Sequence, residues 1–215
     1  MVTTVPGSEY LTSSLNAISQ GLQIPVVVLL LIFALISIIM LGGLISEYTS
    51  RVKVSVNKIE KLVFNISDAQ SLDEVKQIVE NARIPKSQKL VLMKVIRANR
   101  LTKEARQALA RKLIASEEEG FQKSLSRSDI ITRIGPTLGL MGTLIPMGPG
   151  LAALGAGDIN TLANSIIVAF DTTVVGIGSG AVAYFVSKVR RSWYEEYLTN
   201  LDVLIDALID KLDHL

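Results

Sequence analysis

The stretch from Ile134 to Ser187 constrains the fold of this chain most, because it contains no Lys, Arg or Glu. Two long uncharged runs, Ile134–Gly157 and Ile159–Ser187, are broken only by Asp158 at their junction and Asp171 within the second run. About 20 apolar residues in a helix span a bilayer, so each run is long enough to cross. The stretch therefore predicts a transmembrane helical hairpin with one acid inside the membrane.

A further span precedes the hairpin. Ile24–Ile45 contains 22 residues without a charge and is rich in Val, Ile and Leu, so residues 23–46 are predicted to form the first transmembrane helix. Pro25 falls at its start, where a missing N–H costs nothing. In residues 1–22, which we expect to be external, apolar residues recur at helical spacing. This pattern is typical of an amphipathic helix at a membrane surface; a frayed terminus is the alternative.

Residues 47–133 are predicted to form a cytoplasmic helical domain. Segment 46–133 carries 18 of the 22 Lys and Arg residues, together with 11 acids. Ser71 followed by Glu74 is a capping box that predicts a helix start, and Pro85 separates that helix from the next. Thr102 is a candidate N-cap for a charged helix that begins at Lys103 and continues into the second span. No strand pattern is found.

A final amphipathic helix is predicted over residues 188–215. It begins with basic residues and an aromatic pair, which is typical of a membrane boundary. An apolar stripe runs along it, formed by Trp193, Tyr197, Leu201, Leu204, Leu208 and Leu212. The acids Asp202, Asp206 and Asp210 recur at a spacing of four. Packing of this helix on the basic segment and a merely solvated acidic face are both compatible with the pattern.

The distribution of basic residues predicts the topology. The four remaining Lys and Arg residues lie in 188–215, and none lies in 1–45 or 134–187. Because positive charges near span ends favour the cytoplasmic side, we expect the N-terminus and the 155–160 turn outside, and segment 46–133 and the C-terminus inside. The predicted fold is an all-α integral membrane protein with three transmembrane helices and long helices extending into the cytoplasm.

The composition argues against several classes of site. The chain has no cysteine, and its one histidine, His214, is second from the end. Thiolate metal sites, disulfides and histidine-based catalytic groups are therefore excluded. A single acidic residue in the membrane also does not supply the set of groups that hydrolysis or group transfer requires. We expect a protein that is not an enzyme, with no cofactor, no metal and no nucleic-acid partner.

The hairpin contains the candidate functional residues. Small residues at a spacing of four let helix backbones approach closely, so five glycines are assigned to helix packing: Gly135, Gly139, Gly142, Gly176 and Gly180. Asp171 is a functional candidate because an ionisable residue at mid-membrane is costly. One face of the third span is small and partly polar: Thr161, Ser165, Val168, Thr172, Gly176 and Ser179. We expect it to meet another subunit or line a cavity, although a single membrane threonine more often bonds its own helix.

The two spans carry motifs that resemble those of the MotA/TolQ/ExbB proton-channel family. The family pattern Pro-x-x-Gly-Leu-x-Gly-Thr is matched by residues 136–143, Pro-Thr-Leu-Gly-Leu-Met-Gly-Thr. Its third-span pattern, small residues ending in a threonine with Gly three residues on, is matched by residues 169–176. Three spans with an external N-terminus are similar to the ExbB/TolQ branch, whereas the MotA branch has four spans.

The resemblance implies a pentameric ring, in the prokaryotic cytoplasmic membrane, whose second and third spans line a pore. A dimer of single-span ExbD/TolR-like partners, each with a membrane aspartate, would lie inside and turn as ions flow. Thr143 and Thr173 would face that aspartate, and Thr172 and Asp171 complete the candidate ion pathway. The family glutamate is Val168 here; Asp171 lies nearly on the same face three residues later. The family's aromatic-Gly pair after the second-span motif is Ile145-Pro146.

Two other functions remain as alternatives. A non-conducting membrane scaffold would use Asp171 only to pair with a partner span, and a membrane enzyme is the weakest alternative. The sequence leaves open whether H⁺ or Na⁺ is used, which process is driven, which partner takes part, and whether Asp171 replaces the family glutamate.

Overall fold

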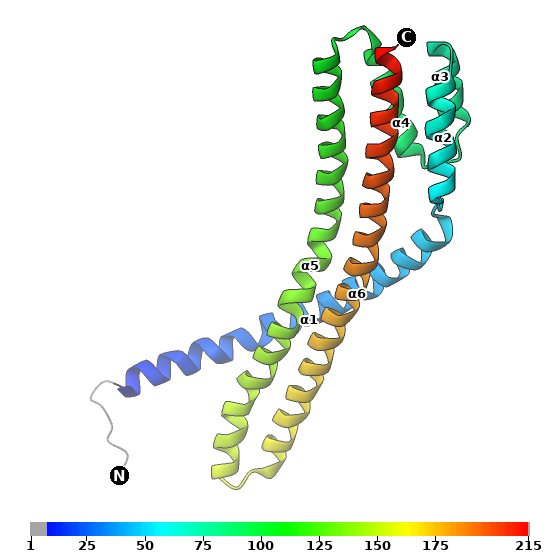
Figure 1. Ribbon diagram of the computed structural model, residues 1–215. Coiled ribbons are helices and arrows are strands. Elements are labelled where there is room, and N and C mark those ends of the chain that lie inside the picture. Colours follow the sequence, from blue (N-terminus) through cyan, green and yellow to red (C-terminus); the bar gives the residue numbers. More distant parts are fainter. Residues whose placement is uncertain (1–7, 215) are drawn as a thin grey trace. The chain divides into compact units, whose positions relative to one another are not determined.

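The computed structural model describes residues 8–214, and it contains no strand within that range. The helices are α1 (Ser8–Ser50), α2 (Val56–Asp68), α3 (Leu72–Asn81), α4 (Lys86–Arg97), a short 3₁₀ turn η1 (Ala98–Arg100), α5 (Lys103–Gly155) and α6 (Ile159–Asp213) (Figure 1). Three of them, α1, α5 and α6, are long and apolar enough to cross a membrane. The predicted all-α class with three candidate spans is confirmed.

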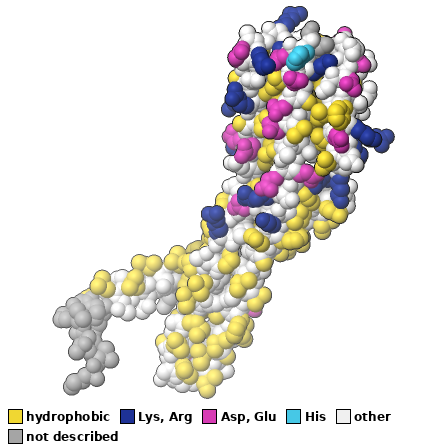
Figure 2. Space-filling view, viewed as in Figure 1, with side chains coloured by type: hydrophobic (Ala, Val, Ile, Leu, Met, Phe, Trp, Pro, Cys, Tyr) yellow, Lys and Arg dark blue, Asp and Glu magenta, His cyan; other side chains and the backbone are white. Residues whose placement is uncertain are grey.

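The chain divides into two compact units. One, called here the membrane unit, comprises residues up to Ile45 together with Ser126–Lys188; the other, called the charged unit, comprises Ser46–Leu125 and Val189–Leu215. Hydrophobic side chains cover the visible face of the membrane unit, whereas acidic and basic side chains cover that of the charged unit (Figure 2). The helices α5 and α6 contribute to both units without a break.

The helix α1 starts at Ser8, so Pro25 lies inside the helix and not in its first turn as the sequence suggests. A proline in a helix removes one hydrogen bond and crowds the carbonyl four residues earlier; here that residue is Gly21, which has no side chain to add to the crowding. The exposed apolar residues of the first turns, among them Leu11 and Leu15, therefore continue directly into the span. Residues 1–7 of the expected external segment lie outside the described residues.

Within the membrane unit, α1 packs on both helices of the hairpin. Val26 and Leu30 are buried with Leu138 of α5, and Val175 of α6 packs against the same cluster. Two turns after Leu30, the buried Ser37 hydroxyl donates to the Ser179 carbonyl at 3.1 Å. The Ser37 hydroxyl therefore has a hydrogen-bond partner within the protein, as a polar group buried in a bilayer requires.

The connection between α5 and α6 is a tight glycine turn. Gly157 has φ +81°, and the amides of Gly157 and Asp158 donate to the carbonyls of Leu154 and Ala153, which is a Schellman motif. The Asp158 carboxylate then accepts from the Thr161 amide at 3.1 Å and caps α6. Hydrogen bonds from the Thr161 hydroxyl and amide lower the pKa of Asp158. This turn fixes the antiparallel alignment of the two spans.

The predicted helix caps and the predicted apolar stripe of α6 are both found in the charged unit. The Ser71 hydroxyl accepts from the Glu74 amide at 3.3 Å and starts α3, and Thr102 accepts from Ala105 to start α5. The core of the unit is apolar: Ile59, Leu62, Ile66, Val75, Val79, Leu92, Val95 and Ile96 pack with Leu201, Leu204, Ile205 and Leu208 of α6. The apolar stripe of α6 is therefore buried against α2, α3 and α4, while Asp202, Asp206 and Asp210 stay exposed.

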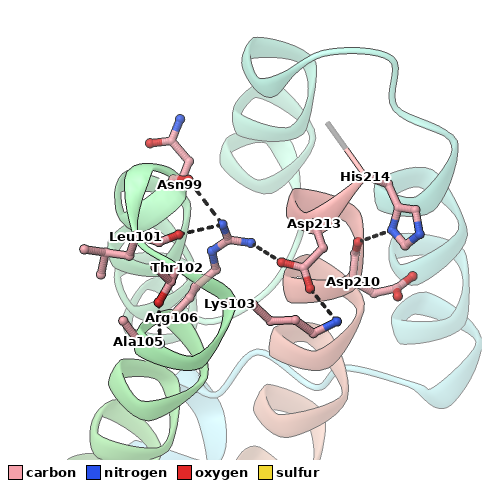
Figure 3. A network of polar contacts seen from close by, with 9 residues as sticks. All are labelled: Asn99, Leu101, Thr102, Lys103, Ala105, Arg106, Asp210, Asp213 and His214. Atoms are coloured by element: carbon pink, nitrogen blue, oxygen red, sulfur yellow. Dashed lines mark hydrogen bonds and ion pairs between the residues drawn. The ribbon is translucent and has the colours of Figure 1, made fainter.

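A buried guanidinium fastens the end of α6 to the start of α5 (Figure 3). Arg106 is 4% exposed; it donates to the Asn99 and Leu101 carbonyls at 3.2 Å and to Asp213 at 2.7 Å. Lys103 lies 2.9 Å from the second oxygen of the same carboxylate. The Lys103 hydrogen bond, followed by the charges of Lys103 and Arg106, lowers the pKa of Asp213. The contact joins two segments that are more than 100 residues apart in the sequence.

Candidate functional site in the membrane hairpin

A line of glycines brings α5 and α6 into backbone contact within the membrane unit. A Cβ on Gly139 would lie 3.2 Å from the Gly176 Cα, and one on Gly135 would lie 3.1 Å from the Gly176 carbonyl oxygen. Nearer the Gly157 turn, a Cβ on Gly142 would lie 2.6 Å from the Thr172 Cβ. Farther from that turn, a Cβ on Gly180 would meet the Pro136 ring at 2.8 Å. The five glycines assigned to helix packing from the sequence all lie in this seam.

The small polar face of α6 lies in the same seam, which corrects one expectation. Thr172 and Ser179 are 6% and 5% exposed, and Ser165 lies 2.9 Å from the position of a Gly150 Cβ. These residues were expected to meet another subunit or a cavity, but they pack on α5 of their own chain. The glycines opposite them explain the difference, because they leave room for hydroxyl-bearing side chains between two closely spaced backbones.

The hydroxyls of the candidate threonines bond to their own helices. Thr143 donates to the Leu140 carbonyl at 2.6 Å, and Thr173 donates to the Ala169 carbonyl at 3.0 Å. Thr172 donates to the Val168 and Ala169 carbonyls at 2.9 and 3.0 Å. Each hydroxyl uses its proton in this way and keeps its oxygen lone pairs as acceptors. Such a group can accept a hydrogen bond from a protonated acid and cannot donate to a charged one without first breaking its own bond.

The burial of the three threonines separates them into two kinds. Thr172 is buried in the seam, whereas Thr143 and Thr173 are half-buried. Because Gly142 packs on Thr172, their neighbours Thr143 and Thr173 lie at nearly the same level along the two antiparallel helices. The structure therefore brings Thr143 and Thr173 to one depth and leaves part of each accessible from outside the chain.

Asp171 is exposed on the surface of the membrane unit. Among residues 8–214, its carboxylate takes part in no hydrogen bond or ion pair. At 100° per residue, Asn164 and Gly178 lie within about 20° of it around α6, and both are exposed. Phe170, Val174 and Ile177, on the adjoining outer surface of α6, are also exposed. The one acid of the third span thus sits on a narrow polar strip beside an apolar surface.

Two further polar features were not singled out from the sequence. Ser37 of α1, described above, is buried between spans. The feature of the sequence that could have indicated this contact is a lone serine in an apolar run. At the end of the hairpin away from the Gly157 turn, the Ser187 hydroxyl donates to the Asp129 carboxylate at 2.6 Å. Among the described residues, no cluster of three or more His, Cys, Asp or Glu could hold a metal ion.

The hairpin and the helices that continue from it lie within a known family pattern. Residues 63–202, well over half of the chain, match the model of the MotA/TolQ/ExbB proton channel family. The chain belongs to the MotA/TolQ/ExbB proton channel family. The match includes α5, the part of α6 up to residue 202, and with them Thr143, Asp171, Thr172 and Thr173. The recognition made from the hairpin motifs is confirmed, and three spans are consistent with the ExbB/TolQ branch.

Membership in the MotA/TolQ/ExbB family fixes the general class of the protein. It is a multi-pass membrane protein with three candidate spans. The family is one of membrane channels that form complexes, and it is not an enzyme family. No curated protein matches the sequence.

Proposed function

We propose that the chain is the stator subunit of a motor driven by the proton-motive force. In this proposal five copies form a ring in the prokaryotic cytoplasmic membrane around a dimer of single-span ExbD/TolR-like partners. Proton flow between ring and dimer turns one against the other and so drives mechanical work or energised transport. Family membership supports the channel class.

The observation that carries the proposal is the exposed position of Asp171. A carboxylate in the membrane has to be paired, hydrated or protonated, and among residues 8–214 Asp171 has no such partner. A second span, supplied by a neighbouring copy or by the partner, would provide one. A carboxylate that exchanges partners as the ring turns can take up a proton from one side and release it to the other.

Thr143 and Thr173 receive a supporting role in this proposal. They lie at one depth, they are half-buried, and their oxygens remain free to accept. A protonated partner aspartate that passes them can donate to these oxygens, which lowers the cost of its neutral form in the membrane. Thr172, which is buried in the seam, would position the helices and would not touch the ion.

The proposed topology places the charged unit in the cytoplasm. Arg51 and Lys53 follow the first span, Arg127 and Arg133 precede the second, and Lys188 follows the third. These charges all favour the inside of the membrane. The N-terminus and the Gly157 turn are then outside, and the C-terminus is inside.

A non-conducting scaffold is the second candidate function. The observation that favours it is that all three candidate threonines already donate to their own helices. In a scaffold, Asp171 would form one permanent hydrogen bond or ion pair with a partner span and would never titrate.

Replacement of Asp171 separates the two functions. Asp171→Asn keeps size and hydrogen bonding but cannot carry a proton, and Asp171→Glu is the matched control that still can. We would reconstitute each variant in liposomes with a single-span partner that bears a membrane aspartate, impose a pH gradient, and follow its decay with an internal pH-sensitive dye. The proposal expects normal assembly of both, with proton flux abolished in the Asn variant and retained in part in the Glu variant. Wild-type flux in Asp171→Asn would remove Asp171 from the ion path.

A further inference from the structure

A groove with oppositely charged rims runs between α5 and α6 in the charged unit. Its volume is about 360 Å³, and its floor is apolar: Ala110, Ile114, Ile205 and Ile209. The α6 rim carries Asp202, Asp206 and Asp210, and the α5 rim carries Lys103 and Arg111. Among residues 8–214, the side chains of the three aspartates and of Arg111 take part in no hydrogen bond or ion pair.

The helix α2 presents an aromatic side chain away from the core of the same unit. Phe64 is 59% exposed, whereas Ile59, Leu62 and Ile66 form the buried side of α2. At 100° per residue, Phe64 points about 140° or more away from each of these three. An exposed phenylalanine on a charged helix is a candidate anchor for another protein surface.

The residues beside Phe64 have opposite charges on its two flanks. Around the helix axis, Lys61 lies about 60° to one side of Phe64 and Glu60 about 40° to the other. Both are exposed, and within the described part of the chain neither forms an ion pair. The surface of α2 is therefore a ridge with an apolar crest and one charge of each sign, which matches a groove with an apolar floor and rims of each sign.

We propose that α2 of one copy docks into the α5–α6 groove of a neighbouring copy. Phe64 lies on the floor between Ile205 and Ile209, Lys61 faces the aspartate rim, and Glu60 faces the Lys103 and Arg111 rim. This inference rests on the proposed function, in which several copies form a ring, and it names the surfaces that join them in the charged unit.

The arrangement of the charged unit favours a second copy as the occupant of the groove. The groove lies at α5 and α6, whereas α2 and α3 form the other side of the unit (Figure 1). Two different, complementary patches on opposite sides of one subunit produce a head-to-tail contact, which closes into a ring when the rotation fits. A two-fold dimer would instead require one patch that fits itself in shape, and neither a ridge against a ridge nor a groove against a groove does so.

Disulfide formation between copies tests the contact directly, because the chain has no cysteine of its own. Full-length Lys61→Cys and Asp206→Cys chains, each with its own tag, would be co-expressed with the partner and oxidised in membranes. A disulfide that joins the two tags can form only between copies. We expect it for this pair and not for Lys94→Cys with Asp206→Cys, in which the first cysteine is on an exposed position of α4.

Charge reversal and removal of the aromatic anchor extend the test to the forces involved. Lys61→Glu in the Glu60→Cys chain should lower the yield of its cross-link to an Arg111→Cys chain, and Asp206→Lys in that Arg111→Cys chain should restore the yield. Phe64→Ser should lower the yield of the disulfide between Lys61→Cys and Asp206→Cys chains about tenfold. A tenfold loss corresponds to the removal of a contact worth about 1.4 kcal/mol. Leu90→Ser, the matched loss of an exposed apolar side chain on α4, should leave that yield unchanged.

The outcomes separate this inference from the proposed function. An oligomer that is intact by native mass spectrometry but gives no Lys61–Asp206 cross-link overturns the docking and leaves the ring. Cross-links between two Lys61→Cys chains indicate a two-fold contact and also overturn the docking. Chains that remain monomeric in mild detergent and uncross-linked in membranes overturn both the ring and the docking.

Discussion

Gly139 and Gly176 meet backbone to backbone, so that a Cβ on Gly176 would lie 2.7 Å from the Gly139 Cα. The same Cβ would lie 2.7 Å from the Gly135 carbonyl oxygen. Backbone atoms cannot rotate away as a side chain can, so even one methyl group would force α5 and α6 apart. Spans in a bilayer associate through close packing of this kind, since lipid offers no hydrophobic drive between helices.

Gly176→Ala is therefore expected to destabilise the hairpin. Overpacking of a tight contact costs about 1–3 kcal/mol, and the midpoint of thermal unfolding in mild detergent should fall accordingly. The matched control is Gly178→Ala, two residues further along the same helix, where a Cβ would meet nothing within 4 Å. Alanine is the better helix former by about 1 kcal/mol, so the control should be neutral or stabilising. Equal losses in both variants would contradict the seam.

Substitution of the threonines by valine should separate the buried hydroxyl from the accessible ones. Valine keeps the shape of Thr172 in the seam and removes only a bond to its own helix, so Thr172→Val should assemble and conduct as wild type does. Thr143→Val and Thr173→Val remove acceptors from half-buried positions and should lower proton flux without lowering the amount of assembled complex. Flux in the reconstituted liposomes is the measurement. A loss confined to Thr172→Val would place the ion path in the seam.

Arg106→Met should unfold the charged unit at lower temperature than wild type. The change removes the donors to the Asn99 and Leu101 carbonyls and to Asp213, and a buried group left without its hydrogen bond costs about 1–3 kcal/mol. The matched control, Lys103→Met, removes a more exposed partner of the same carboxylate and should cost less, because solvent screens an exposed ion pair. Circular dichroism during heating of the full chain would distinguish the two variants.

The pH dependence of stability should reveal the Lys103–Asp213 contact. Lys103 lowers the pKa of Asp213 below its ordinary 3.8 in the folded state. When folding lowers the pKa of a carboxyl group, the stabilisation that results is complete at pH values above the pKa of the unfolded state. It is lost as the pH falls through the pKa of the folded state. The difference in unfolding midpoint between wild type and Lys103→Met should thus be largest near neutral pH and shrink below about pH 4. A difference that grows on acidification would contradict this coupling.

Thiol labelling of intact cells would test the proposed orientation. A cysteine at Lys86 should resist an impermeant thiol reagent, and one at Ala156 in the turn should react. Ala156 is preferred to Gly157, whose positive φ would strain any side chain. Reaction at Lys86 with protection at Ala156 would reverse the topology.

The sequence predicts the local features of this fold well. The starts of α3 and α5 follow from Ser71 and Thr102, because a cap is a contact within four residues. The positions of the spans can be predicted from the absence of charged residues, because the bilayer requires a whole segment to be apolar. The paired glycines also indicate that the spans approach closely, and the structure shows them in contact.

The orientation of α6 could not be predicted from its own sequence. Asp171 and Thr172 are adjacent, and helical spacing places both on overlapping polar faces, so either face could have turned inward. The choice depends on α5, where Gly142 makes room for Thr172 and no residue makes room for a carboxylate. The Arg106–Asp213 contact is equally invisible in the sequence, because it joins segments whose proximity exists only after folding.

The three-residue connection at Gly157 also bears on how the protein reaches its membrane. Seam contacts join residues at nearly equal distances on either side of it, from Gly150 with Ser165 near the turn to Gly142 with Thr172 and Gly135 with Ser179. Once the turn has formed, each new contact lies only one or two helical turns beyond the last, so little loop entropy opposes the next step. The two spans can therefore close from the turn outward and enter the bilayer as one preformed hairpin. A single residue inserted at the turn would rotate α6 by about 100° and place a side chain opposite every glycine, so the length of this connection should tolerate no change during biogenesis.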